Sequence, residues 1–218
     1  MKINADLTKR ATADTTDMEW QESPAEGVWR KMLDRDGEEV ARATSLVRYA
    51  PGSSFPEHTH GGGEEFFVLE GTFSDEKGDY PAGTYVRNPI DSSHSPRSDD
   101  GCVILVKLRQ MSDPDEPRVV VDTNEETWQP VDDAPVERIP LFESHKTGES
   151  VCLERWKPDT TFSPREWSGG AEYFVLTGSF ADDFGAYAEG SWLRVPAGST
   201  QEVSTANGCT VWIKRGHL

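Results

Sequence analysis

The chain has 218 residues, and its 39 acidic against 22 basic side chains give it a formal net charge of −17. This charge repels polyanions, so we expect neither nucleic acid nor an anionic membrane as a partner. The three cysteines form no C-x-x-C pair, residues 1–18 contain no signal-like apolar run, and no stretch approaches the roughly 18 apolar residues of a membrane span, which together favour a cytoplasmic protein.

Short segments rich in Val, Phe and Tyr are separated by Gly, Pro and Asp along the chain. The clearest strands are expected at residues 66–69, 84–87 and 103–108. No segment has the sustained 3.6-residue apolar period of a long helix. Residues 119–121 are either part of a linker or an added strand. The pattern predicts an all-β sandwich or barrel fold.

The second half of the chain repeats the first. Residues 51–108 align without gaps on residues 158–215, and 20 of the 58 aligned positions are identical. The most similar stretch reads GGGEEFFVLEGTFSD in the first copy and SGGAEYFVLTGSFAD in the second. Duplication is the simplest explanation. We therefore expect two domains, residues 1–112 and 113–218, with the boundary near Asp113.

The first copy contains four side chains of the kinds that bind metal ions. His58 and His60 are two residues apart, so on a strand both imidazoles leave the same face, about 7 Å apart along the chain. Glycines at 61–63 permit a tight turn that returns Glu64 toward them. His94 follows a later turn led by a proline. Three imidazoles and one carboxylate predict a mononuclear site for a divalent transition metal.

The second copy lacks these ligands. Glu172 in this copy aligns with Glu65, which indicates that Glu65 is structural and that Glu64 is the ligand. We expect Arg165 and Trp167 to fold inward and fill the second pocket with a cation–π contact, with a small-molecule pocket as the alternative. The residues at the four ligand positions of the second copy are Arg165, Trp167, Ala171 and Gln201.

Other candidate reactive residues have simpler explanations. Cys102 and Cys209 occupy matching strand positions with apolar neighbours, so we expect buried, unreactive thiols. His145 and His217 lie outside both motifs, and we expect both to be exposed.

Residues 52–71 and 83–94 resemble the two signature motifs of the cupin superfamily in residue types and spacing. The first reads GSSFPEHTHGGGEEFFVLEG and the second GTYVRNPIDSSH. The resemblance implies two tandem cupin barrels, each a double-stranded β-helix or jelly roll, and so a bicupin. Asp91 stands where the second motif usually has Gly, which concerns the shape of the turn rather than coordination. The metal ligands that the resemblance assigns are His58, His60, Glu64 and His94.

Three further runs resemble the cupin domain of ChrR-type anti-sigma factors. They are EWQESPAEGVWRKML at 19–33, TSLVRYAPG at 44–52 and FSDEKGDYPAG at 73–83. In that family the cupin domain binds zinc and takes part in stress sensing, while a separate N-terminal zinc domain binds the sigma factor. The cysteines of this chain all lie in or near predicted barrel strands, so the resemblance does not extend to the ligands of that zinc domain.

The resemblance implies a metal-binding protein with a sensory or regulatory role in stress-responsive transcription. It would hold one divalent transition metal per chain, with zinc expected first and Fe(II), Mn or Ni as alternatives. The alternative function is a mononuclear Fe(II) dioxygenase that acts on a small diketone-like substrate; no catalytic residue is assigned beyond the ligands. A small-molecule or reactive ligand, a regulatory protein and a second copy of the chain are the expected partners.

Overall fold

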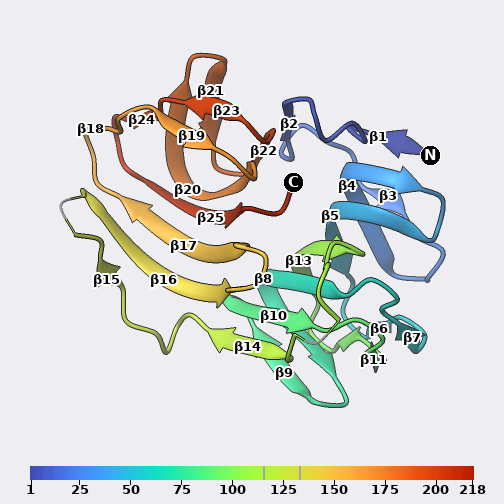
Figure 1. The fold of residues 1–218 in the computed structure, drawn as a ribbon. Coiled ribbons are helices and arrows are strands. Elements are labelled where there is room, and N and C mark those ends of the chain that lie inside the picture. Colours follow the sequence, from blue (N-terminus) through green and yellow to red (C-terminus); the bar gives the residue numbers. More distant parts are fainter. Residues whose placement is uncertain (115, 133) are drawn as a thin grey trace. The chain divides into compact units, whose positions relative to one another are not determined.

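The computed structural model describes residues 1–114, 116–132 and 134–218. These residues form strands and turns with no α-helix, which confirms the all-β prediction. The described part of the chain accordingly has no helix long and apolar enough to cross a membrane. The chain forms two compact units, one of residues 1–5 and 19–126 and the other of residues 6–18 and 127–218 (Figure 1).

The first unit is built around one antiparallel sheet that runs in the order β1-β4-β5-β13-β8-β10-β14, with β3, β6, β9 and β12 pairing alongside it. β7 and β11 form a separate two-stranded sheet. The strands are β1 (Lys2–Ile3), β3 (Gln21–Glu22), β4 (Val28–Gly37), β5 (Ala41–Tyr49), β6 (Ser53–Ser54), β7 (His58–Thr59), β8 (Glu64–Asp75), β9 (Gly78–Pro81), β10 (Thr84–Asn88), β11 (Ser93–His94), β12 (Arg97–Ser98), β13 (Cys102–Leu108) and β14 (Val119–Asp122).

Alternate residues of β8 and β13 build the core of this unit. Phe66 and Val68 on β8 pack in the same buried cluster as Ile104 and Val106 on β13. Successive side chains of a strand point to opposite faces, so this spacing places one face of each strand toward the barrel interior. The β-branched and aromatic side chains that predicted these strands are therefore the ones that fill the core.

The second unit repeats this architecture. Its main sheet runs β15-β16-β17-β25-β20-β22-β2, with β18, β21 and β24 alongside, and β19 and β23 form its two-stranded sheet. The strands are β2 (Ala11–Asp14), β15 (Gln129–Pro130), β16 (Val136–Glu143), β17 (Ser150–Trp156), β18 (Thr160–Thr161), β19 (Arg165–Trp167), β20 (Ala171–Asp182), β21 (Gly185–Ala188), β22 (Ser191–Val195), β23 (Ser199–Gln201), β24 (Ser204–Thr205) and β25 (Cys209–Arg215).

Each unit includes one strand that comes from the part of the sequence expected to form the other unit. β14 lies within the expected second domain, residues 113–218, yet it pairs with β10 of the first unit. β2 precedes the first repeat, yet it pairs with β22 of the second unit. The segment at 119–121 is thus an added strand, and the boundary between the units does not follow a single cut in the sequence.

Candidate metal centre

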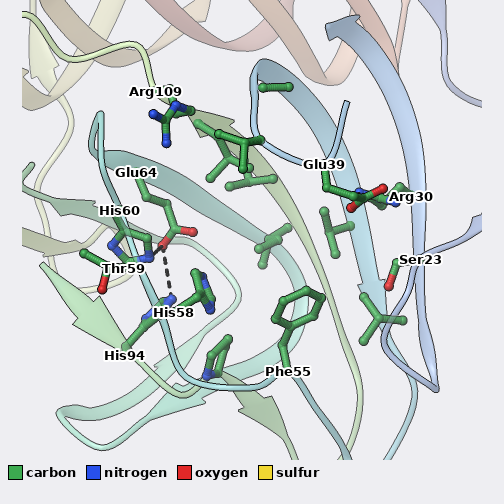
Figure 2. Close-up of a pocket in the computed structure, with 18 of the residues that line it drawn as sticks. Ser23, Arg30, Glu39, Phe55, His58, Thr59, His60, Glu64, His94 and Arg109 are labelled. Carbon is green, nitrogen blue, oxygen red and sulfur yellow. Dashed lines mark hydrogen bonds and ion pairs between the residues drawn. The ribbon is translucent and has the colours of Figure 1, made fainter. Parts of the chain in front are cut away.

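Two short strands of the first unit bring its three candidate histidines together. β7 and β11 pair antiparallel with His58 directly opposite His94. His60 follows β7, and its backbone N–H donates to Ser92 O at 2.8 Å. The centroids of the three imidazole rings lie between 4.6 and 5.0 Å apart (Figure 2). The pairing of β7 with β11 therefore joins the two sequence motifs at one point.

A glycine turn delivers the carboxylate. Gly63 has a φ of 74°, and its N–H donates to His60 O at 3.0 Å, which closes the turn before β8. Glu64 Oε1 lies 3.7 Å from His60 Nε2 and 3.5 Å from His94 Nε2. One ligand atom from each of the four predicted residues lies within 4.8 Å of every other, a spacing that could hold a metal ion.

Each imidazole makes a hydrogen bond through its Nδ1 atom. A hydrogen bond at Nδ1 fixes how a histidine ring is turned. The pairs are His58 Nδ1 with Pro56 O at 3.0 Å, His60 Nδ1 with Ser92 Oγ at 3.0 Å, and His94 Nδ1 with Asp75 Oδ2 at 3.1 Å.

These partners also decide the tautomer. A carbonyl and a carboxylate can only accept, and Ser92 Oγ uses its own proton on Pro89 O at 2.6 Å. Each Nδ1 must then carry the proton, which leaves the Nε2 lone pair available. Within the described residues, the buried Nε2 atoms of His60 and His94 have no hydrogen-bond partner. Buried imidazole nitrogens with free lone pairs beside a carboxylate fit a transition-metal ion.

The surroundings keep the His60 imidazole neutral and the Asp75 carboxylate charged. Burial, reinforced by the nearby charges of His94 and His58, lowers the pKa of His60 to about 4. Burial alone would raise the pKa of Asp75, but hydrogen bonds from His94, from the Lys77 backbone and from Tyr80 lower it to about 2. A carboxylate that accepts from the Nδ1–H of a histidine, as Asp75 does from His94, is the arrangement that strengthens a histidine ligand.

Sequence reasoning missed three supporting residues. Asp75 and Ser92 orient imidazoles, and Asn88 donates from Nδ2 to Glu64 Oε1 at 3.1 Å. The identity of Asp75 with Asp182 in the alignment is a signal that could have revealed the first of them. Ser92 is likewise identical with Ser199, whereas Asn88 aligns with Val195 and carries no such signal, because its role depends on strand register.

Glu65 points into a different environment from its neighbour. Its Oε2 accepts from Tyr85 OH at 2.7 Å and from Arg87 Nη1 at 3.1 Å, and all three side chains are buried. The structural role predicted for Glu65 is thereby confirmed.

Asp91, the departure from the usual second motif, has a φ of 64°, a left-handed conformation that glycine normally supplies.

A cavity of about 340 Å³ adjoins the four candidate ligands. Most of its wall is apolar, and Phe55 packs edge-on against the His58 ring with centroids 5.4 Å apart. Arg30, Glu39 and Arg109 supply charged groups elsewhere on its lining (Figure 2). The size is that of pockets for small organic molecules. A ligand in this cavity would lie against the imidazoles.

The second repeat fills the corresponding position with a hydrogen-bonded network. β19 pairs with β23 so that Arg165 lies opposite Gln201, as His58 lies opposite His94. Trp167 Nε1 donates to Gln201 Oε1 at 3.1 Å. The Arg165 guanidinium lies 4.4 Å from the centroid of the Trp167 ring, which confirms the predicted cation–π contact. The pocket is not filled, however, since a cavity of about 210 Å³ remains beside these residues.

Both aligned cysteines are buried, as predicted, and burial raises the pKa of Cys102 to about 11 and that of Cys209 to about 12. The prediction for His217 is wrong, whereas His145 is exposed. The His217 side chain is only 2% exposed, and its Nε2 lies 3.2 Å from Glu172 Oε2. The reason is backbone pairing of the last residues with the turn at 169–170.

Comparisons with known proteins agree with the two repeats. The sequence model of the family described as the ChrR cupin-like domain matches residues 8–112 and again residues 116–218. No curated protein sequence matches the chain.

Several solved structures share the fold at low sequence identity. A candidate dioxygenase from Nostoc punctiforme PCC 73102 superposes with a TM-score of 0.80 at 16% identity, covering 97% of this chain and 84% of that one. Protein Ylba from E. coli gives 0.70 at 14% identity, covering 100% and 94%. A variant of the oxalate decarboxylase of B. subtilis gives 0.63 at 13% identity, covering 94% and 77%. The predicted pair of cupin barrels is confirmed.

Proposed function

Because this chain belongs to the family of ChrR cupin-like domains, we propose that its first barrel holds one divalent transition metal and acts as a mononuclear non-haem oxygenase on a small, mostly apolar substrate. The observation that carries this proposal is the cavity of about 340 Å³, whose lining includes all four candidate ligands. A metal centre that served only to order the barrel would not need space for a second molecule beside it.

The donor set agrees with this proposal. Imidazoles together with a carboxylate are typical of non-haem iron centres, although the same donors also bind zinc, manganese or nickel. A metal bound there would supply Lewis-acid and redox chemistry toward the oxygen atoms of a substrate. The chain's own residues would orient the imidazoles through Asp75 and Ser92, bind the apolar part of the substrate against Phe55, and exclude water with the apolar wall.

The second candidate function is a zinc-dependent sensor with a regulatory protein partner. The family match favours it, and four protein ligands would complete the tetrahedral coordination that structural zinc sites show. In that case the adjoining cavity would admit the small molecule or reactive species that is sensed. A diketone-like substrate is expected only for the oxygenase and not for the sensor.

The metal content of protein purified without chelator distinguishes the two functions. Mass-spectrometric metal analysis should give about one metal per chain, and Glu64→Ala and His94→Ala should each remove most of it. Iron together with oxygen uptake on a panel of β-diketones would support the oxygenase. Zinc without oxygen uptake, also after loading with Fe(II), would support the sensor. A trace content that both variants leave unchanged would contradict both functions.

A further inference from the structure

The second unit contains a cavity at the place that corresponds to the metal-side cavity of the first. Ile104 aligns with Val211, and their strand partners Val47 and Glu154 therefore hold equivalent positions in the two units. In the same way, Leu108 of the first unit aligns with Arg215 of the second. Apolar positions of one cavity are therefore charged in the other. The cavity of about 210 Å³ is lined by three arginines and one glutamate, together with an apolar wall.

One carboxylate is shared between two of the arginines. Glu154 Oε1 accepts from Arg138 Nη2 at 2.6 Å and from Arg215 Nη2 at 2.8 Å, while its Oε2 accepts from Trp156 Nε1 at 3.0 Å. Burial alone would raise the pKa of Glu154, but Arg215, the Trp156 hydrogen bond and Arg138 lower it to about 2. The glutamate is charged at neutral pH, and it offsets one positive charge of the three.

The third arginine has no acidic partner. Among the residues that the structure describes, no carboxylate lies within ion-pair distance of Arg165, which rests on the Trp167 ring. Partial desolvation and then the charge of Arg215 lower the pKa of Arg165, and the more distant charge of Glu154 opposes them only in part. In addition, Arg215 Nε is buried and has no hydrogen-bond partner in the described chain. A buried unpaired donor beside an unpaired cation indicates a missing acceptor.

The lining of this cavity carries an excess of positive charge, whereas the chain as a whole carries a net charge of −17. Guanidinium groups bind carboxylates in a geometry that is often bidentate. The rest of the wall is apolar, with the rings of Trp156 and Phe162 5.0 Å apart. A volume of 210 Å³ is about seven times the share of one water molecule in the liquid, which suits a small organic molecule.

We propose that the second barrel binds a small organic carboxylate, with the carboxylate on Arg165 and the apolar body against Trp156 and Phe162. This site is independent of the metal in the first barrel. In the second repeat, arginine stands where the first repeat has a candidate metal ligand, so a different recognition group occupies the same position of the fold.

Isothermal titration calorimetry of the full chain with benzoate tests the proposal. We expect saturable binding, and we expect neutral benzamide and inorganic phosphate each to bind more weakly, because the first lacks the charge and the second the apolar body. Arg165→Gln should weaken benzoate binding about ten- to hundredfold, the usual effect of losing a charged hydrogen-bond partner. Arg165 is exposed, so the variant should fold.

Arg155→Gln is the matched control. Arg155 lies on β17 next to Glu154, pairs with Glu137 at 2.7 Å, and does not line the cavity, so its variant should bind benzoate as the parent does. Glu64→Ala in the first barrel should also leave benzoate binding unchanged. The proposal is overturned if benzoate shows no saturable binding, if Arg165→Gln binds it as the parent does, if Glu64→Ala abolishes binding, or if phosphate binds as tightly.

Discussion

Gln201 donates a hydrogen bond from Nε2 to Asp182 Oδ2 over 2.7 Å. In the first repeat the aligned pair is His94 and Asp75, whose Nδ1 and Oδ2 lie 3.1 Å apart. The acid and its hydrogen bond are thus present in both repeats, whereas only the first repeat has a histidine at the aligned position. Asp75 is therefore a positioning residue that the fold supplies independently of the metal ligands.

Asp75→Asn should weaken metal binding about ten- to hundredfold, the usual effect of losing the outer partner of a histidine ligand. The amide carries no charge to hold the Nδ1–H of His94. Competition with a chromophoric chelator measures the affinity. Asp182→Asn is the control in the other repeat, and an equal loss of affinity in that variant would show that the effect is general destabilisation.

The two adjacent glutamates should respond in opposite ways to the same substitution. Glu65→Gln removes one of the two carboxylates that pair with buried Arg87, while Glu116 remains, so it should cost about 1–3 kcal/mol of unfolding free energy and leave the metal content at the parent's level. Glu64→Gln should remove metal and change the stability of metal-free protein by less than about 1 kcal/mol. Urea unfolding and metal analysis of both variants check this, and identical behaviour would contradict the assignment.

The glycine turn before β8 should tolerate a side chain at one end only. Gly63→Ala forces alanine into a left-handed conformation, with a φ of 74°, and its Cβ would overlap Met111. We expect a loss of about 1–3 kcal/mol. Gly61→Ala would meet only the flexible end of Arg109, at 3.2 Å, and should change stability by less than about 0.5 kcal/mol. Thermal midpoints of the two variants, measured without metal, decide this.

Glu154 should make the stability of the second barrel depend on acid pH. Its pKa is about 2 in the folded chain against a model-peptide value of 4.5, so the folded state binds the proton less readily than the unfolded state. The resulting stabilisation, on the order of 3 kcal/mol, is complete above pH 4.5 and is lost as the pH falls toward 2. Denaturant unfolding at several pH values measures it.

Glu154→Gln should flatten that part of the curve and should lower stability at neutral pH, because Arg138 and Arg215 lose their shared partner. Glu166→Gln, at an exposed position of β19, should keep the parent's profile. A parent whose stability does not change between pH 4.5 and 2, or a Glu154→Gln profile as steep as the parent's, would refute the prediction.

Much of the first barrel could be predicted, because its ligands lie in two short motifs with fixed spacing. The spacing of His58 and His60 places both on one face, and the glycines account for the return of Glu64. The sizes of the cavities could not be predicted, and a pocket in the second repeat was only an alternative, since cavity volume depends on how side chains from separate strands pack. The boundaries of the units could not be predicted either, because β2 and β14 lie outside the aligned repeat and only their pairing with β22 and β10 assigns them to a unit.

That pairing sets an order of events during translation. Every segment of the first unit has been made once residue 126 is reached, whereas β2 must wait for β22 near the other end of the chain. At roughly 5–20 residues per second the delay is on the order of ten seconds or more. β2 is therefore made before most of the first unit and yet pairs late, and the barrel with the candidate metal site can close while the other is still incomplete.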